Sequence, residues 1–182
     1  PGADTPTFTK DVAPILYEHC VVCHRPGEVA PMTLIDYEDV RPWSRAIRAK
    51  VESREMPPWH ADPRYGEFRN ARGLTQEQMA TIVAWSDGGA PEGTAADLPL
   101  VPVFSDGWSA GEPTYIIEMP VEFELPMQGE IDYHNFYTPV PLPEDVFLKA
   151  VEMRPGNREV VHHAGAYNVE LPVDTHLENG LL

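Results

Sequence analysis

The five residues Cys20-Val21-Val22-Cys23-His24 constrain this chain more than any other stretch, because they contain its only two cysteines. Two thiols three positions apart can add to the two vinyl groups of haem, and the adjacent histidine can reach the haem iron from the same turn. The pattern therefore predicts one covalently attached haem c, held by thioether bonds to Cys20 and Cys23, with His24 as an axial ligand of the iron.

The cysteine pair has three other interpretations: a zinc site, a thioredoxin-like redox pair and a disulfide. A zinc site of the usual kind needs further cysteine ligands, and the chain has none. A thioredoxin-like pair follows a strand of a βαβ unit, whereas the residues before Cys20 have the spacing of an amphipathic helix. A disulfide between Cys20 and Cys23 stays open at this point.

Six-coordinate haem iron needs a second axial ligand from elsewhere in the chain. Met32 follows His24 by only eight residues, too few to pass around a porphyrin, and Met79 is explained as an inward residue of an expected helix. Met56 is followed by two prolines that restrict the backbone next to its sulfur. Because Met/His ligation is a common cytochrome arrangement, we expect Met56 to be the ligand, with His60 as the alternative.

Apolar residues recur at three- and four-residue spacing in the first half, which predicts helices over 11–19, over 37–53 and from Thr75 to Gly88. Thr75 and Gln78 have the spacing of a capping box, and two glycines favour an end at 88–89. The stretch 56–73 is rich in Pro, Arg and Gly and is expected to be a loop. The side chains expected to face inward are Val12, Ile15, Leu16 and His19, then Val40, Trp43, Ile47 and Val51, then Met79, Ile82 and Val83.

The second half has the alternation typical of strands, most clearly over 121–125. We therefore expect an α-then-β chain: a helical domain over 1–95, a Pro-rich linker over 96–107, and a β-rich, possibly incomplete domain over 108–182 with the form of a β-sandwich. The expected strands are 115–119, 121–125, 133–137, 146–153 and 159–169.

Charge excludes several classes of function. The 182 residues have a net charge of -16, and no Lys/Arg cluster of the kind that binds nucleic acid is present. Residues 1–95 hold 10 Lys and Arg and 14 Asp and Glu, a net charge of -4, whereas residues 96–182 hold 3 and 15, a net charge of -12. No apolar run is long enough to span a membrane. The acidic surface favours a partner protein with a basic docking surface.

Residues 5–93 resemble a small monohaem cytochrome c domain. The resemblance rests on 8–12, the Cys20–His24 pattern, Met56-Pro57-Pro58-Trp59, and 85–91. It implies that the first and last helices cross and pack, with Tyr17 and Trp85 near the crossing, and that a loop between them carries the ligand methionine. It also implies export to the periplasm, with a signal peptide already removed, because haem meets the thiols outside the bacterial cytoplasm.

Residues 108–170 are similar to the start of a copper type II ascorbate-dependent monooxygenase domain, the family of peptidylglycine and dopamine β-monooxygenases. The adjacent His162 and His163 match a histidine pair that supplies two of three ligands to one copper in that family, and imidazole suits copper. A third ligand could come from His134 or His176. On a regular strand, however, neighbouring side chains point to opposite faces, so the pair could also be one buried and one exposed residue.

Three functions fit these patterns. The first is a periplasmic electron-transfer protein that passes single electrons through one haem, rather than an enzyme. The second is the N-terminal part of a haem-coupled copper monooxygenase, if the chain belongs to a longer one. The third is an accessory haem subunit of a larger redox complex.

Overall fold

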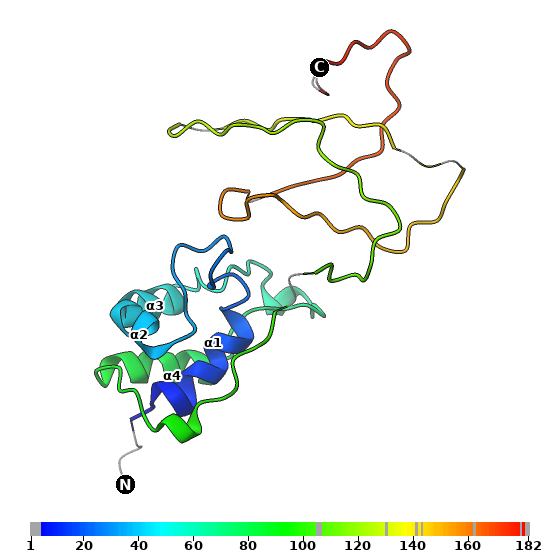
Figure 1. Cartoon of the computed structure of the whole chain (residues 1–182). Helices are drawn as coiled ribbons and strands as arrows, with labels where there is room; N and C mark the ends of the chain where they lie inside the picture. Colours follow the sequence, from blue (N-terminus) through cyan, green and yellow to red (C-terminus); the bar gives the residue numbers. More distant parts are fainter. Residues whose placement is uncertain are drawn as a thin grey trace. The chain divides into compact units, whose positions relative to one another are not determined.

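The chain forms two compact units in the computed structural model, which describes residues 5–104, 107–129, 131–140, 142, 144–161, 163–178 and 180 (Figure 1). Unit 1 comprises Pro1–Phe104 and Pro155–His163, and unit 2 comprises Ser105–Arg154 and Ala164–Leu182. Segment 155–163, which the sequence assigned to the expected β-rich domain, thus belongs to unit 1.

The first helical segment begins with a single π-helical stretch, Phe8–Val12, and continues as α1, Ala13–His19. The predicted helix over 11–19 is confirmed, with helical backbone starting three residues earlier. Its expected apolar face is confirmed as well, because Val12, Ile15 and Leu16 are buried.

The predicted helix over 37–53 is interrupted. It consists of α2, Tyr37–Val40, a 3₁₀ turn, Arg41–Trp43, and α3, Ser44–Glu52. Pro42 has no backbone N–H to continue the α-helical ladder, and the tighter 3₁₀ turn displaces Trp43 from the face that buried Val40, Ile47 and Val51 share. The prediction that Trp43 faces inward is therefore wrong, since 45% of this residue is exposed.

Helix α4, Gln76–Asp87, begins with the predicted capping box. The Gln78 backbone N–H donates to Thr75 Oγ1 over 3.1 Å, and the Thr75 backbone N–H donates to Gln78 Oε1 over 2.9 Å. The helix ends at Gly88, and Gly89 adopts the left-handed backbone conformation with φ of 87°. Both ends of this helix are as the sequence predicts.

Replacing the cap residue, Thr75→Ala, should lower the free energy of unfolding by about 0.5–2 kcal/mol, because the Gln78 N–H loses its acceptor. The matched control is Thr81→Ala within α4, where the hydroxyl only donates back to the Glu77 carbonyl and alanine has the higher helix propensity. Urea unfolding followed by far-ultraviolet circular dichroism measures both. An equal loss in the two variants would contradict the capping role.

The core of unit 1 joins the start of the first helical segment to α4 and to the residues after it. The Phe8 ring lies 6.4 Å from the Trp85 ring, centroid to centroid, and the Trp85 Nε1–H donates to the Pro91 carbonyl over 2.9 Å. The Phe8 backbone N–H donates to the same carbonyl over 2.9 Å. These contacts close the helical unit by holding its two ends together, with Trp85 between them.

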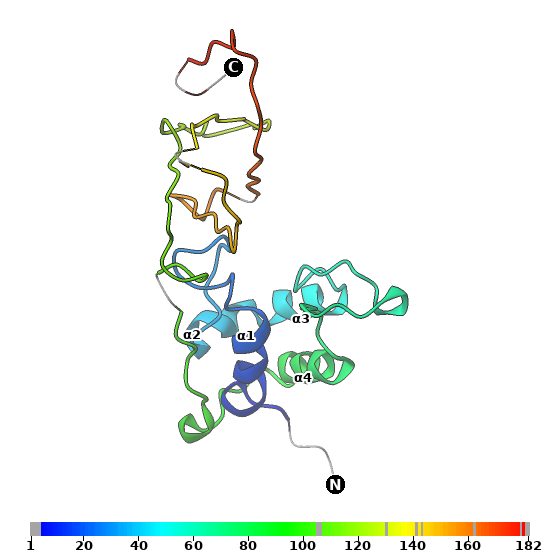
Figure 2. The same cartoon turned by 90° about the vertical axis from the view of Figure 1, so that its right-hand side faces the viewer.

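Helices α3 and α4 lie side by side (Figures 1 and 2). The Ser86 hydroxyl of α4 donates to the Ser44 carbonyl over 3.1 Å, and Arg48 Nη1 of α3 lies 2.8 Å from Asp87 Oδ1. Ile47 of α3 and Ile82 of α4 are both buried in the core. Two 3₁₀ turns, Pro63–Tyr65 and Ala95–Asp97, complete the helical elements of the described residues.

The expected β-sandwich is not present, and this prediction is wrong. In the described part of the chain beyond Asp97 there is no strand, only a single bridge residue at Glu178. Among the residues whose burial the structure describes, the buried apolar ones lie between Phe8 and Ala90, whereas Met127 and Phe147 are fully exposed. Alternation favours a strand only where neighbouring strands pair with it and cover one face, and the described residues of unit 2 form no such strands.

The part of the chain that the structure describes contains no helix with the length and apolarity needed to cross a membrane.

Candidate functional site

The predicted haem-attachment residues form one turn directly after α1. Cys20 is the C-cap of the helix, and its carbonyl accepts hydrogen bonds from the backbone N–H groups of Cys23 over 3.1 Å and His24 over 2.9 Å. Val21 is completely buried and fixes the turn against the core, while Val22 is exposed. The two thiols are partly buried and not joined to each other. The structure therefore brings Cys20, Cys23 and His24 together.

His24 has the arrangement of a metal-binding imidazole. Its Nδ1 lies 3.3 Å from the Met32 carbonyl oxygen, which can only accept a hydrogen bond, so Nδ1 carries the proton and Nε2 keeps its lone pair. Burial lowers the pKa of the imidazole below its ordinary value, more than the Met32 hydrogen bond raises it. A neutral ring whose other nitrogen donates to a carbonyl is typical of metal-ligating histidines. This chemistry fits an axial ligand of iron.

The Cys20 thiol does not fit a redox-active pair. Burial, together with the nearby Cys23, raises the pKa of the Cys20 thiol to about 12. Redox-active cysteines have a lowered pKa, commonly because they lie at a helix N-terminus, whereas Cys20 lies at the C-terminal end of α1, where the helix dipole disfavours a thiolate. Among the described residues there is also no group of three His, Cys, Asp or Glu side chains that could hold a metal ion such as zinc.

The candidates for the second axial position lie in different surroundings. The carbonyl of Met32 faces His24 Nδ1, so the backbone of this residue is held at the side of the ring opposite to Nε2. Met79 is partly buried and packs against the core from α4. Met56 is 40% exposed in the loop after α3, where its backbone N–H donates to the Lys50 carbonyl over 3.1 Å. His60 is exposed in the same loop.

The loop that carries Met56 is held by its own aromatic residues. Pro57 is buried, and the ring of Trp59 packs edge-on against Phe68 with centroids 5.8 Å apart. Gly73 passes close to the same tryptophan, since a Cβ at this position would lie 3.6 Å from the Trp59 ring. The loop therefore returns on itself between Met56 and the start of α4.

The histidines proposed for copper belong to both units. His162 lies outside the described residues, and His163 is an exposed residue of unit 1. His134 belongs to unit 2, where its ring lies 4.4 Å from that of Phe123, and His176 is an exposed residue of the same unit.

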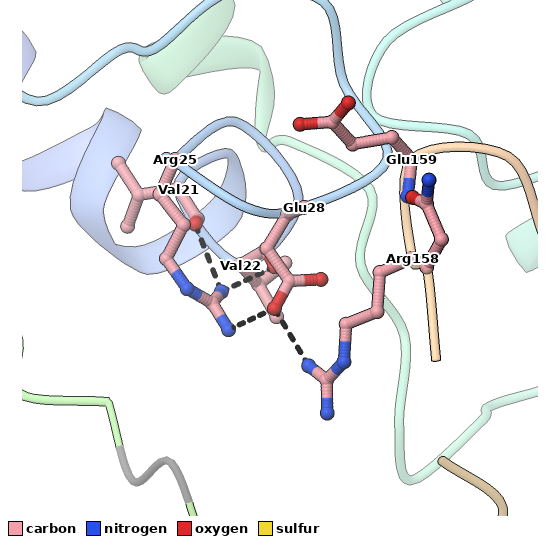
Figure 3. A network of polar contacts seen from close by, with 7 residues as sticks. Val21, Val22, Arg25, Glu28, Arg158 and Glu159 are labelled. Atoms are coloured by element: carbon pink, nitrogen blue, oxygen red, sulfur yellow. Dashed lines mark hydrogen bonds and ion pairs between the residues drawn. The ribbon is translucent and has the colours of Figure 1, made fainter. Parts of the chain in front are cut away.

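Three charged residues near the Cys20–His24 turn were not predicted from the sequence. Arg25 follows His24 directly and pairs with Glu28, and Glu28 also pairs with Arg158 (Figure 3). Opposite charges at a spacing of three residues, immediately after the histidine, were a readable signal for the first pair. Nothing in the sequence indicates the second pair.

Comparisons of the chain with models of protein families, with curated proteins and with solved structures gave no match.

Proposed function

We propose that unit 1 is a c-type cytochrome that transfers single electrons through one covalently attached haem. The observation that carries the proposal is the Cys20–His24 turn, in which two free thiols and a neutral imidazole lie in one turn and the imidazole keeps a lone pair on Nε2. The unfavourable environment for a Cys20 thiolate supports this function over a dithiol redox function.

In the proposed holoprotein each residue of the turn has its own task. Cys20 and Cys23 would supply the sulfur atoms of the two thioether bonds, and His24 would hold the iron through Nε2, with Nδ1 donating to the Met32 carbonyl. Met56, in the loop after α3, would supply the second ligand of the iron. The haem iron, when bound, supplies the reversible one-electron change. Buried Val21 keeps the turn fixed, so that little rearrangement accompanies electron transfer.

The proposal includes the cellular location of the protein and the kind of partner that it binds. Attachment of haem to the two thiols would require export, and together with the cytochrome resemblance it supports a periplasmic location. The net charge of -16 favours a redox partner with a basic docking surface, with association that slows as salt screens the charges.

Iron and copper measured per chain, together with a reduced-minus-oxidised absorption spectrum and a haem stain after denaturing electrophoresis, test the proposed function. We expect one iron per chain and stain that stays with the unfolded polypeptide, since thioether bonds survive denaturation. Colour that is lost on denaturation would contradict covalent attachment. One copper per chain that survives dialysis against a chelator would instead favour the copper-dependent monooxygenase.

The axial assignment has its own test, Met56→Ala in the haem-loaded protein. Loss of the thioether should remove the weak sulfur-to-iron charge-transfer band of the oxidised protein and lower the reduction potential, because a thioether favours reduced iron. The matched control is Met79→Ala, which should keep the band and cost about 1–2 kcal/mol of stability, below the range for fully buried methionines because this side chain is partly exposed. Loss of the band in the control alone would reverse the assignment.

A further inference from the structure

The guanidinium of Arg25 binds two backbone carbonyls of the Cys20–His24 turn. Its Nη1–H groups donate to the Val21 carbonyl over 3.2 Å and to the Val22 carbonyl. These carbonyls follow the end of α1, where backbone acceptors have no partner within the helix. Arg25 therefore fixes the backbone between the two cysteines, and a cation at this end of a helix is also favoured by the helix dipole.

The position of Arg25 is itself fixed by two contacts. Its Nη2 lies 2.6 Å from Glu28 Oε1, and its guanidinium carbon lies 3.9 Å from the centroid of the Phe104 ring. Only 16% of the Arg25 side chain and 15% of the Glu28 side chain are exposed. The Coulomb attraction of an ion pair shielded from water to this degree is screened less by solvent and salt than that of a surface pair.

Glu28 has a second cationic partner from a distant part of the chain. Arg158 Nη1 donates to the same oxygen, Glu28 Oε1, over 2.7 Å, and Figure 3 shows the two guanidinium groups reaching this carboxylate from different segments. The turn that presents Arg158 is shaped locally, because the Glu159 backbone N–H donates to Asn157 Oδ1 over 3.0 Å. One carboxylate thus joins the Cys20–His24 turn to segment 155–163.

We propose that Glu28 is a positioning residue that holds segment 155–163 against the haem-binding turn through Arg158. Segment 155–163 is then part of the cytochrome unit and affects the reduction potential of the haem iron. The proposal rests on the proposed function, because it assigns an effect on the haem potential. Arg25 and Arg158 carry two positive charges against the single negative charge of Glu28, which leaves one net positive charge beside the turn.

The sign of the effect follows from charge. A positive charge near iron stabilises the reduced state relative to the oxidised state, and contacts around the ligands tune the potential of a haem. Arg158→Ala should therefore lower the potential, and Glu28→Gln should raise it. Both variants break the same ion pair, so both should release segment 155–163.

The test uses the full haem-loaded chain and measures two quantities. Hydrogen–deuterium exchange of the amides in 155–163 measures how firmly the Glu28–Arg158 pair holds this segment, and spectroelectrochemical titration measures the midpoint potential of the haem. The variants are Arg158→Ala, Glu28→Gln and the pair combined, with Arg158→Lys as the conservative variant. The matched control is Arg45→Ala, which removes the same charge from an exposed position of α3.

We expect faster exchange at 155–163 in both single variants, no further gain in the double variant, partial rescue by Arg158→Lys, and potential shifts of opposite sign. If exchange at 155–163 in the variants matches that of the Arg45→Ala control, the Glu28–Arg158 pair does not hold the segment. If exchange is faster but the midpoint potential equals that of the control, Glu28 is not a positioning residue for the haem. If the purified chain carries no covalent haem, the proposed function fails on that result, while the exchange measurement still decides whether Glu28 holds the segment.

Discussion

Replacing both Cys20 and Cys23 by serine should leave the purified chain without covalently bound haem. A serine hydroxyl has nearly the size of a thiol but forms no thioether with a vinyl group, so the fold of the turn is kept while the attachment chemistry is lost. Haem stain at the protein band and iron per chain should both fall to background after expression in a host that matures c-type cytochromes. This is the largest effect that we expect from any substitution in the molecule.

The matched control is Val22→Ser, which places a hydroxyl in the same turn at an exposed position between the two cysteines. It should keep full haem stain, because neither thiol nor His24 is touched. Stain that persists in the double cysteine variant, or that disappears equally in the control, would contradict attachment through Cys20 and Cys23.

The second large effect is on stability. Trp85→Ala should lower the free energy of unfolding by about 3–5 kcal/mol, the range for removing a large buried aromatic side chain. Trp85 has 0% exposure, and its indole N–H donates to the Pro91 carbonyl over 2.9 Å, so the variant leaves a cavity and removes one of the two hydrogen bonds to that carbonyl. Urea unfolding followed by far-ultraviolet circular dichroism reports on this loss, because the helices of the described residues belong to unit 1.

Trp43→Ala is the control for this second prediction, because it removes the same side chain from a position that is 45% exposed. We expect it to cost less than about 1 kcal/mol, as substitutions outside the core usually do. Equal losses at the two tryptophans would mean that α4 is not held by the core contacts between Trp85 and Phe8.

The burial of Trp85 and the exposure of Trp43 show which side-chain positions could be predicted from the sequence and which could not. Trp85 was placed near the packing of the first and last helices from a resemblance, and its contact with Phe8 lies in that region. Trp43 was placed inward by a helical spacing that assumed one continuous helix. Pro42 lies within that segment, and Trp43 leaves the shared face in the 3₁₀ turn that Pro42 occupies, whereas Ile47 and Val51 beyond the turn are buried as the spacing predicts.

The strand predicted over 121–125 in the second half failed for a different reason. The alternation of 121–125 is a local property, and it predicts a strand only if other strands cover one face of it. Val121 and Phe123 are partly buried, but Leu125 is 40% exposed and no strand forms in the described part of unit 2. Whether a pattern becomes a sheet depends on non-local pairing, which a single segment does not encode.

The amino-acid sequence by itself determined the local features of this protein. The helical face of α1, the capping box at Thr75 and the end of α4, and the turn that joins Cys20 to His24 all depend on residues within a few positions of each other, and so spacing was enough to predict them.

Only the tertiary structure decided how the turn is held. The hydrogen bond from His24 to the Met32 carbonyl sets the tautomer of the imidazole, and the Phe104 ring packs against Arg25. Glu28 meets Arg158 across 130 positions of sequence. The physical reason is that such contacts are selected by burial and charge once the chain has folded, and a carboxylate so shielded from water is stable only with the cations that packing brings to it.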